Sequence, residues 1–332
     1  PPRSTPFPTR RSSDLWQMLG GSVDTTDVVG TANNAGSAVA RDMTIAARLE
    51  KLKGRLKAAG GCMVAFSGGV DSSFLLYVAH LVLGERAIGV TVSTCYMSPR
   101  EMTEAEAFVR RYGMRHLQLT LPLSETIRHN PADKCYHCKK RIFSSILQEA
   151  EKRRVPLVFD GTNSDDAFDY RPGMKALREL GIVSPLQETG FTKNEIRKAA
   201  HRLGLPVWDK PAFACLLSRI PVGEEVTEEK LRQIDQAEQI LFDAGFRAFR
   251  VRHHGDIARL EVDREERAKI CDVDLADDIS KKIKKLGFRY VAFELEGYRM
   301  GSMNAMSPEN KVLSHDENGR DIAGAATRRD FG

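Results

Sequence analysis

The sequence predicts an α/β fold: a doubly wound parallel sheet followed by a smaller C-terminal α+β domain. Three observations carry this prediction. Short apolar segments alternate with longer segments of helical character from residue 42 to about residue 220. A glycine-rich turn follows the first apolar segment, and the pattern of apolar and charged residues changes after Pro221. Strands that alternate with helices are typical of βαβ units, whose parallel sheet is covered by helices on both faces.

The first domain begins with a helix, a strand and a second helix. Between residues 42 and 57, apolar residues recur at helical spacing among Lys and Arg, and Gly60-Gly61 ends that helix. Residues 62–66 form a short apolar run, which predicts a buried strand. Residues 72–83 are apolar on nearly every side, so we expect a buried helix there.

The same alternation continues to residue 203. The predicted elements are strands at 87–92, 115–121 and 156–159 and helices at 101–111, 141–152 and 192–203. The last of these helices has the clearest ends. Thr192 and Glu195 form a capping box at its start, and Gly204 and Pro206 close it.

The second domain starts with a long charged helix. The predicted elements are helices at 227–244 and 265–286 and strands at 249–252, 258–262 and 290–295. Thr227 is expected to cap the first of these helices. We therefore predict a nucleotide-binding domain over residues 41–220, an α+β substrate or oligomerisation domain over 221–306, and a loose polar tail over 307–332.

The first forty residues are set apart from the fold. Residues 7–15, FPTRRSSDL, resemble the translation of a common sequencing adapter, so residues 1–15 are excluded from fold reasoning. The remainder, up to about Ala40, is rich in Gly, Ser, Thr and Asn. This composition predicts a disordered lead-in over residues 1–40.

Composition narrows the classes of function. No apolar run has membrane-spanning length, which predicts no membrane partner. Six cysteines are too few for a disulfide scaffold, and the Cys-x-x-Cys pair among them favours a reducing compartment and a cytoplasmic protein. The formal charge of +5 hints at anionic ligands and is too mild to indicate nucleic acid.

The most informative segment is Ser67-Gly68-Gly69-Val70-Asp71-Ser72-Ser73, between a predicted strand and a predicted helix. Its glycines let the backbone approach a ligand closely. The amides and dipole of the following helix favour an anion, and the three serines can add hydroxyl donors. The segment is neither a Walker loop nor a dinucleotide Gly-x-Gly-x-x-Gly turn. We predict a phosphate-binding turn; an ordinary turn of small residues is the alternative.

A second polar segment, residues 160–166, also follows a predicted strand. It lies at the carboxyl end of the sheet, where ligands bind in doubly wound folds. Thr162, Asn163 and Asp166 are the candidates to bond a ribose or hold magnesium. An Asx-rich surface turn is the alternative for each of them.

Three cysteines form the candidate sulfur site. Cys135 and Cys138 make the Cys-x-x-Cys pair, and Cys215 follows roughly eighty residues later in a similarly polar segment. A structural zinc site wants four ligands, whereas three thiolates suit an iron–sulfur cluster that keeps one open iron. Lys210 and Arg219 are expected to favour the Cys215 thiolate. The other three cysteines look like inert packing residues.

The glycine-rich segment resembles the PP-loop of the ATP pyrophosphatase superfamily, whose members have the adenine-nucleotide α-hydrolase-like fold. The resemblance implies that residues 67–73 bind the phosphates of ATP, which is split into AMP and pyrophosphate. An oxygen of the substrate attacks the α-phosphorus, and a nucleophile later displaces AMP. The resemblance also implies that Asp71 helps to hold the Mg²⁺ that accompanies ATP, a role suited to a hard oxygen ligand.

Several longer segments resemble the LarE family of sulfurtransferases. They are NPADKCYHCKK, DGTNSDDAFDYRPG, TKNEIRKAAHRLGLP, WDKPAFACLLSRIP, FRVRHHGDIARLEV and ELEGYRMGSMN, and the resemblance covers residues 42–304. It implies that ATP adenylates a carboxylate of a pyridinium mononucleotide and that sulfur then leaves a thiocarboxylate, for the nickel-pincer cofactor of lactate racemase. It also implies a homo-oligomer, a hexamer built from dimers.

Members of that family differ in their source of sulfur. Some sacrifice the sulfur of one cysteine, which matches Cys215, and others bind a [4Fe–4S] cluster with an extra sulfide through three cysteines, which match Cys135, Cys138 and Cys215. This sequence has all three, so we favour the cluster version, recharged by a sulfide donor. Cys215 serves in both versions.

The second domain contributes a basic strand. Arg250 and Arg252 alternate onto one face of it, where two guanidiniums suit a phosphate. The resemblance implies that they clamp the substrate phosphate, and a solvated charged strand is the alternative. Glu238, in the preceding helix, is a further candidate to orient the substrate.

Three rival functions remain at this point. A PP-loop tRNA thiolase would need a strongly basic face or an RNA-binding attachment, and neither is evident. An amidating synthetase would need an ammonia source, and none is visible. A non-catalytic nucleotide-binding iron–sulfur sensor would keep the loop and the cysteines but would release no pyrophosphate.

Overall fold

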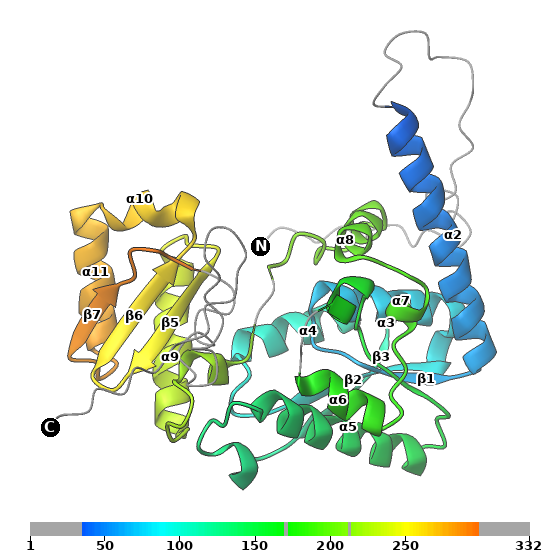
Figure 1. The fold of residues 1–332 in the computed structure, drawn as a ribbon, viewed down its shortest axis with the longest axis horizontal. Coiled ribbons are helices and arrows are strands. Elements are labelled where there is room, and N and C mark those ends of the chain that lie inside the picture. The colour runs from blue at the N-terminus through cyan, green and yellow to red at the C-terminus, as the bar shows by residue number, and fades with distance from the viewer. Residues whose placement is uncertain (1–34, 169–171, 212–213, 299–332) are drawn as a thin grey trace, which may run out of the picture. The chain divides into compact units, whose positions relative to one another are not determined.

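A computed structural model describes residues 35–168, 172–211 and 214–298 of the chain, which forms two compact units. Unit 1 is built on a four-stranded sheet in the order β3-β2-β1-β4 (Figure 1). Its strands are β1 (Cys62–Ala65), β2 (Ala87–Ser93), β3 (Arg115–Thr120) and β4 (Val158–Phe159), and each pair is parallel. The predicted α/β class and parallel sheet are confirmed.

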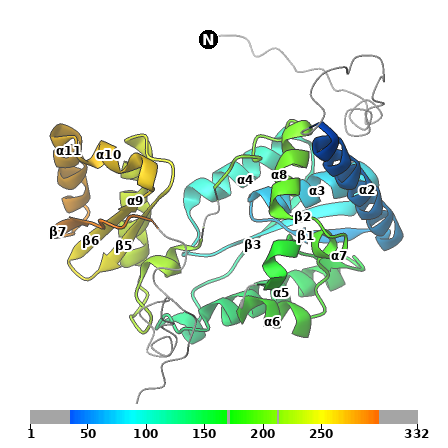
Figure 2. The same ribbon diagram turned by 45° about the horizontal axis from the view of Figure 1, so that its top comes forward.

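Helices cover both faces of this sheet (Figures 1 and 2). The helices of unit 1 are α2 (Ala35–Ala59), α3 (Val70–Leu83), α4 (Pro99–Arg111), α5 (Lys134–Lys152), α6 (Pro172–Glu179), α7 (Pro185–Glu188) and α8 (Lys193–Arg202). One apolar core joins β1 to α2, α3, α4 and α8 around Phe74 and Phe191. A second joins the other face to α5 and α6 around Met63 and Ile146.

Two helices of unit 1 start seven residues earlier than predicted. Helix α2 begins at Ala35, seven residues before the predicted start at Asp42, so part of the predicted lead-in is helical. Helix α5 begins at Lys134, seven residues before the predicted start at Arg141. Its first turn is closed by the Tyr136 amide, which donates to the Asp133 carbonyl at 2.8 Å. The Cys-x-x-Cys pair therefore lies in a helical turn and not in a loop.

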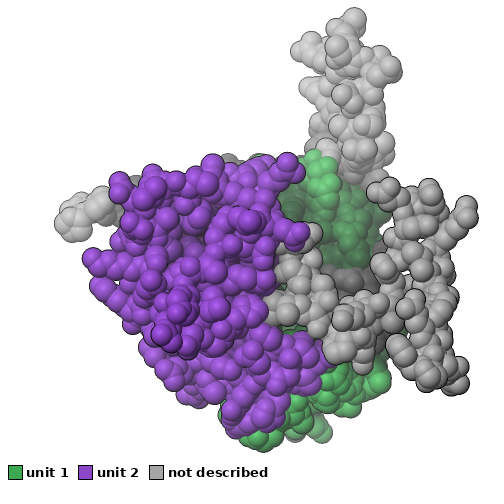
Figure 3. Space-filling model, turned by 60° about the vertical axis from the view of Figure 1, so that its left-hand side comes forward, with its two compact units in different colours: residues 1–127, 133–215 green, residues 128–132, 216–332 purple. Residues whose placement is uncertain are grey.

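Unit 2 comprises residues 128–132 and the chain from 216 onward (Figure 3). Its sheet has the order β5-β6-β7, with β5 (Phe249–His254) antiparallel to β6 (Ile257–Val262) and β6 parallel to β7 (Tyr290–Phe293). The helices are α9 (Glu228–Asp243), α10 (Arg267–Ile270) and α11 (Val273–Lys284). Thr227 caps α9 as predicted, because its hydroxyl accepts from the Lys230 amide.

The single helix predicted over 265–286 is wrong. The segment is broken into α10 and α11 because Asp272 acts as an N-cap, accepting the Leu275 amide at 3.1 Å. None of the helices in the described ranges combines the length and the apolar character that a membrane crossing needs. The predictions for residues 1–34 and 307–332 lie outside the described residues.

The end of α5 carries an unusual residue. The Val155 amide donates to the Ala150 carbonyl at 2.9 Å and the Arg154 amide to the Glu151 carbonyl at 3.0 Å, which is a Schellman motif. Its left-handed position is normally a glycine, but here Arg154 adopts it with φ 56°. A side chain in this conformation brings Cβ too close to the following carbonyl oxygen, which costs about 1 kcal/mol.

We predict that Arg154→Gly is more stable than Arg154→Ala by about 1 kcal/mol, since only glycine lacks the Cβ that strains this backbone. Neither variant retains the exposed arginine side chain, so the comparison isolates the backbone. Urea unfolding of both variants measures the difference. Equal stability would show that the backbone relaxes around Cβ at no cost.

Candidate functional site

The glycine-rich segment forms a tight turn between β1 and α3. Gly68 has φ 73°, and a Cβ there would lie 3.0 Å from the Cβ of Ala105. The Ser67 amide donates to the Ser72 hydroxyl oxygen at 3.2 Å, and that hydroxyl donates to the Gly69 carbonyl at 3.2 Å. These bonds hold the turn with the first amides of α3 at the carboxyl edge of the sheet.

Buried polar atoms at this edge are available to bind a ligand. Asp71 Oδ1 and Ser73 Oγ have no hydrogen-bond partner among the described residues, and the buried Thr94 hydroxyl, which acts on the pKa of Tyr96, lies at the same edge. Ser73 is fully buried, and a buried hydroxyl without a partner is costly unless something completes its bonding. Thr94 follows β2 and was not predicted. The Asp71 and Ser73 oxygens fit a phosphate chain with its magnesium ion: the ion would bind the carboxylate oxygen, and a phosphate oxygen would accept from the Ser73 hydroxyl.

The second predicted loop packs directly against this turn. A Cβ on Gly161 would lie 2.9 Å from the Ser72 nitrogen. The buried carboxylate of Asp160 accepts from the Thr162 hydroxyl and, at 2.5 Å, from the Ser184 hydroxyl. Asn163 and Thr162 are also buried. The Thr162 hydroxyl donates to Asp160, and the Asn163 side-chain oxygen accepts the Asp165 amide at 2.9 Å, so both oxygens help to shape the loop.

Asp166 faces Asp71 from this loop. Its carboxylate accepts the Asn163 amide at 3.0 Å, and its charge acts to raise the pKa of Asp71. Burial is the largest cause of that raised pKa, and the Lys193 ammonium opposes it. Asp71, expected to hold magnesium, and Asp166, a candidate for a ribose or magnesium, therefore lie close enough for their charges to interact.

Two lysines also lie at this site: Lys193, which was not predicted, and Lys210, which was predicted only as a neighbour of Cys215. The Lys193 ammonium contacts Asp71 Oδ2, and it comes from the first residue of α8, whose capping box of Thr192 and Glu195 is confirmed. The Lys210 ammonium donates to the Gly68 carbonyl at 3.1 Å and pairs with Glu104 at 2.6 Å. Both cations lie where phosphates are expected. Their distance in sequence from residue 71 hid them, although each stands in a segment that resembles the LarE family.

The three predicted cysteines share neighbours in unit 1. The Tyr96 hydroxyl lies 3.2 Å from Cys138 Sγ. Burial raises the pKa of both groups, and the charge of Cys215 raises the pKa of Tyr96 a little further. Burial lowers the pKa of the Lys134 ammonium, against the pull of Cys135 and Cys215. A tyrosine and a lysine thus connect thiols that lie eighty residues apart.

The chemistry of these three thiols favours a metal site, but the positions of the side chains do not. Three thiols suit an iron–sulfur cluster. Within the described ranges, however, no three His, Cys, Asp or Glu side chains are gathered as a metal-binding group. Cys62 is buried as predicted, and burial raises the pKa of its thiol to about 12. Cys271 was expected to be packed and is instead exposed.

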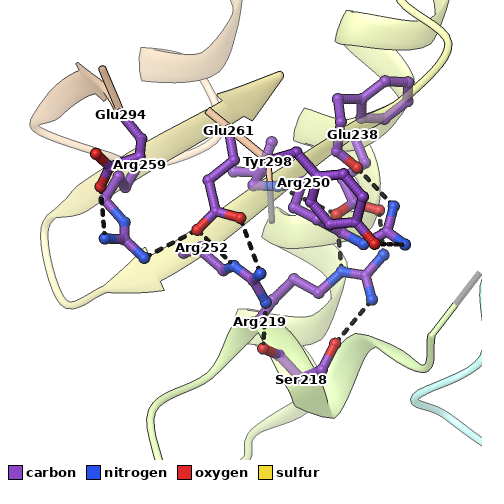
Figure 4. Close-up of polar contacts among 11 residues, drawn as sticks. Ser218, Arg219, Glu238, Arg250, Arg252, Arg259, Glu261, Glu294 and Tyr298 are labelled. Atoms are coloured by element: carbon purple, nitrogen blue, oxygen red, sulfur yellow. Dashed lines mark hydrogen bonds and ion pairs between the residues drawn. The ribbon is translucent and has the colours of Figure 1, made fainter. Parts of the chain in front are cut away.

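In unit 2, Arg250 and Arg252 are both buried in a polar network (Figure 4). Arg252 binds Glu261 through two hydrogen bonds of 3.0 and 2.8 Å and donates to the Ser218 carbonyl at 2.6 Å. Arg250 donates to the Tyr298 hydroxyl at 3.2 Å and lies 4.7 Å from the centre of its ring. They are not solvated charges on an open strand.

A third arginine belongs to the same network. Arg219 is buried and binds Glu238 through hydrogen bonds of 2.8 and 3.0 Å, and Glu238 also accepts the Val251 amide at 3.1 Å. Burial lowers the pKa of Arg250, and the charge of Arg219 lowers it further. Arg219 was predicted only as a neighbour of Cys215, so its place beside Arg250 was missed.

Comparisons with known proteins agree with this geometry. A family model described as NAD synthase matches residues 44–159, which include the glycine-rich turn. Pyridinium-3,5-bisthiocarboxylic acid mononucleotide synthase of Lactiplantibacillus plantarum is 36% identical over 79% of this chain and 95% of that enzyme. An uncharacterized protein of Synechocystis is 37% identical over 77% of this chain and 97% of its own. A glutamine-hydrolyzing GMP synthase component of Archaeoglobus fulgidus is 25% identical over 58% of this chain and 67% of its own.

We predict that Lys193→Ala moves the acid limit of Mg-ATP binding to higher pH. Removing this ammonium leaves burial and Asp166 to raise the pKa of Asp71 with less opposition, and only the ionised carboxylate ligates Mg²⁺. Calorimetric titrations at stepped pH give the pH at which binding is half lost. Lys193→Arg keeps the charge and should stay near the wild type. An unchanged midpoint in the alanine variant would contradict the assignment.

We predict that Glu261→Gln destabilises the protein by about 3 kcal/mol or more, because it leaves the buried Arg252 without its carboxylate. Glu294→Gln is the matched control. It also breaks a pair with Arg259, but both partners are about a quarter exposed, so the loss should be about 1 kcal/mol or less. Urea unfolding of the two variants measures both values. Equal losses of stability in the two variants would mean that burial does not determine how much the Glu261–Arg252 pair contributes to stability.

Proposed function

The chain belongs to the LarE family, that of the pyridinium-3,5-bisthiocarboxylic acid mononucleotide synthases, and we propose that it converts a carboxylate of a pyridinium mononucleotide into a thiocarboxylate. As a member of that family it is an ATP-dependent sulfurtransferase. The observation that supports the substrate most is the extent of the match, which runs through both units and spans 95% of the Lactiplantibacillus plantarum enzyme.

ATP activates the substrate in unit 1. The turn over residues 67–73 binds the phosphates, with Asp71 and Asp166 toward the magnesium ion and Lys193 and Lys210 toward the phosphate oxygens. A carboxylate oxygen of the substrate attacks the α-phosphorus, and pyrophosphate leaves. The acyl adenylate then reacts with sulfur: the new C–S bond forms as the C–O bond to AMP breaks.

The substrate phosphate is recognised by Arg250 and Arg252. A buried guanidinium whose pKa is lowered by burial and by a neighbouring arginine gains from a bound anion, which offsets both effects. Arg252 is held in place by Glu261, so its fork is oriented before the ligand arrives. Glu238 fixes Arg219 and the backbone of β5 behind them.

Sulfur comes from the site of Cys135, Cys138 and Cys215. In the version that we favour, these thiolates hold a [4Fe–4S] cluster, which supplies the transferred sulfide when it is bound. In the other version Cys215 gives up its own sulfur. Tyr96 and Lys134 lie beside these thiols in either case, and the contact with the Tyr96 hydroxyl partly offsets the rise that burial causes in the pKa of Cys138.

The remaining family features stay predictions. They are a homo-oligomer of hexameric size, a cytoplasmic location, a sulfide donor, a lactate racemase as the final beneficiary, and the division into residues 41–220 and 221–306. A native mass measurement tests the first of them.

The decisive experiment is anaerobic purification followed by one turnover with ATP and the pyridinium carboxylate mononucleotide. We expect about four irons per chain, lost in Cys135→Ala, and pyrophosphate release that needs the mononucleotide. Intact mass then shows an unchanged Cys215. The exposed Cys271 offers a matched control, because Cys271→Ala should keep both iron and product.

Two other results would change the proposal. A wild type without iron that becomes lighter by one H₂S on turnover would establish sacrifice of Cys215 and remove the cluster. Failure to release pyrophosphate with this mononucleotide would reject the proposed substrate.

A further inference from the structure

Unit 1 has a cavity of about 530 Å³ at the end of the sheet opposite the glycine-rich turn. It is lined where strands begin: Gly61 precedes β1, Arg86 and Ile88 flank the start of β2, and Arg115 opens β3. Because the strands are parallel, their amino ends meet at this edge and the ATP turn lies at the other. The cavity is therefore separate from the proposed active site.

Four arginines line this cavity. Arg86, Arg115, Arg153 and Arg154 come from three separate segments of the chain. Arg115 lies 3.8 Å from Glu85 and Arg153 lies 2.6 Å from Glu149. Among the described residues, no carboxylate lies within ion-pair distance of Arg86 or Arg154. The cavity thus carries an excess of positive charge beside its two exposed ion pairs.

Part of this charge has a structural explanation. Helices α2 and α5 end at this edge, and basic residues near a helix C-terminus complement the dipole. The helix dipoles do not explain why there is a cavity at this edge. They also do not explain why an arginine occupies a backbone conformation that favours glycine. Arg154 stands at φ 56° in the cavity wall. The buried Ile88 with Val155 and Pro156 adds an apolar lining beside the guanidiniums.

We propose that this cavity binds a phosphate-bearing small molecule. Guanidinium groups bind phosphate oxygens in a forked geometry, and the volume lies in the usual range for small-molecule sites. The apolar lining suits a planar ring attached to the phosphate. Nucleic acid fits less well, since it is bound along an extended basic face and the formal charge of the chain is only +5.

Arginine-specific labelling tests this proposal residue by residue. Phenylglyoxal is reacted with the full chain, with and without AMP or inorganic phosphate, and peptide mass spectrometry gives the labelling rate at each arginine. A ligand at about four times its Kd occupies about 80% of its sites. Labelling of Arg86 and Arg154 should then fall about fivefold. Arg232, exposed on α9 in unit 2, is the internal control and should keep its rate.

A variant shows whether the protection comes from a ligand bound in this cavity or indirectly from AMP bound at the ATP site. Arg154→Gly removes a guanidinium and relieves the strained backbone, so lost binding cannot be ascribed to unfolding. Protection of Arg86 by AMP should drop to less than about twofold in it. If AMP protects at a lower concentration than inorganic phosphate does, the ligand is a nucleotide. If both protect at the same concentration, the ligand is free phosphate. Unchanged labelling of Arg86 and Arg154, or full protection of Arg86 in the variant, would overturn the proposal. Neither result depends on pyrophosphate release or on the sulfur transfer proposed above.

Discussion

The carboxyl edge of unit 1 depends on the close approach of the Gly161 backbone to the first turn of α3, where a Cβ would come within 2.9 Å of the Ser72 nitrogen. This contact brings the loop after β4 against the loop after β1. Across this contact the charge of Asp166 acts on Asp71. Lys193 completes the group from α8, and its backbone amide donates to Asp165 in the same loop. A side chain at Gly161 would collide with the backbone at the start of α3, so one of the two loops would have to move.

Both units bury polar side-chain atoms that have no protein partner among the described residues. At the carboxyl edge of unit 1 these include Asp71 Oδ1 and Ser73 Oγ, which suits atoms that bind a ligand. In unit 2, carboxylates fix two of the buried guanidiniums: Glu238 holds Arg219 and Glu261 holds Arg252. Such pairs contribute little to net stability when buried. They do set the direction of each fork, which is what recognition of a phosphate requires.

Features with a short-range signature could be predicted from the sequence. The parallel sheet, the glycine turn and the capping box of Thr192 and Glu195 all follow from neighbouring residues, and the structure has them. Contacts between distant residues could not be predicted in this way: Lys193 meets Asp71 across more than a hundred residues, and Arg219 joins Arg250 through Glu238. The early start of α5 was missed although Asp133 is a residue type that favours N-caps, and in the structure it holds that position without a side-chain cap bond.

One segment of unit 2 comes from the middle of the unit 1 sequence. Residues 128–132 belong to unit 2, and the buried Asn130 amide donates to the carbonyls of Leu217, Ile220 and Pro221 at 3.2, 2.6 and 3.0 Å. No single cut of the chain can therefore release both units whole. A fragment starting at residue 216 would lack the amide that gathers three of its carbonyls. The two units are therefore not modules that follow one another along the chain, since the second is completed by a segment that lies within the sequence of the first.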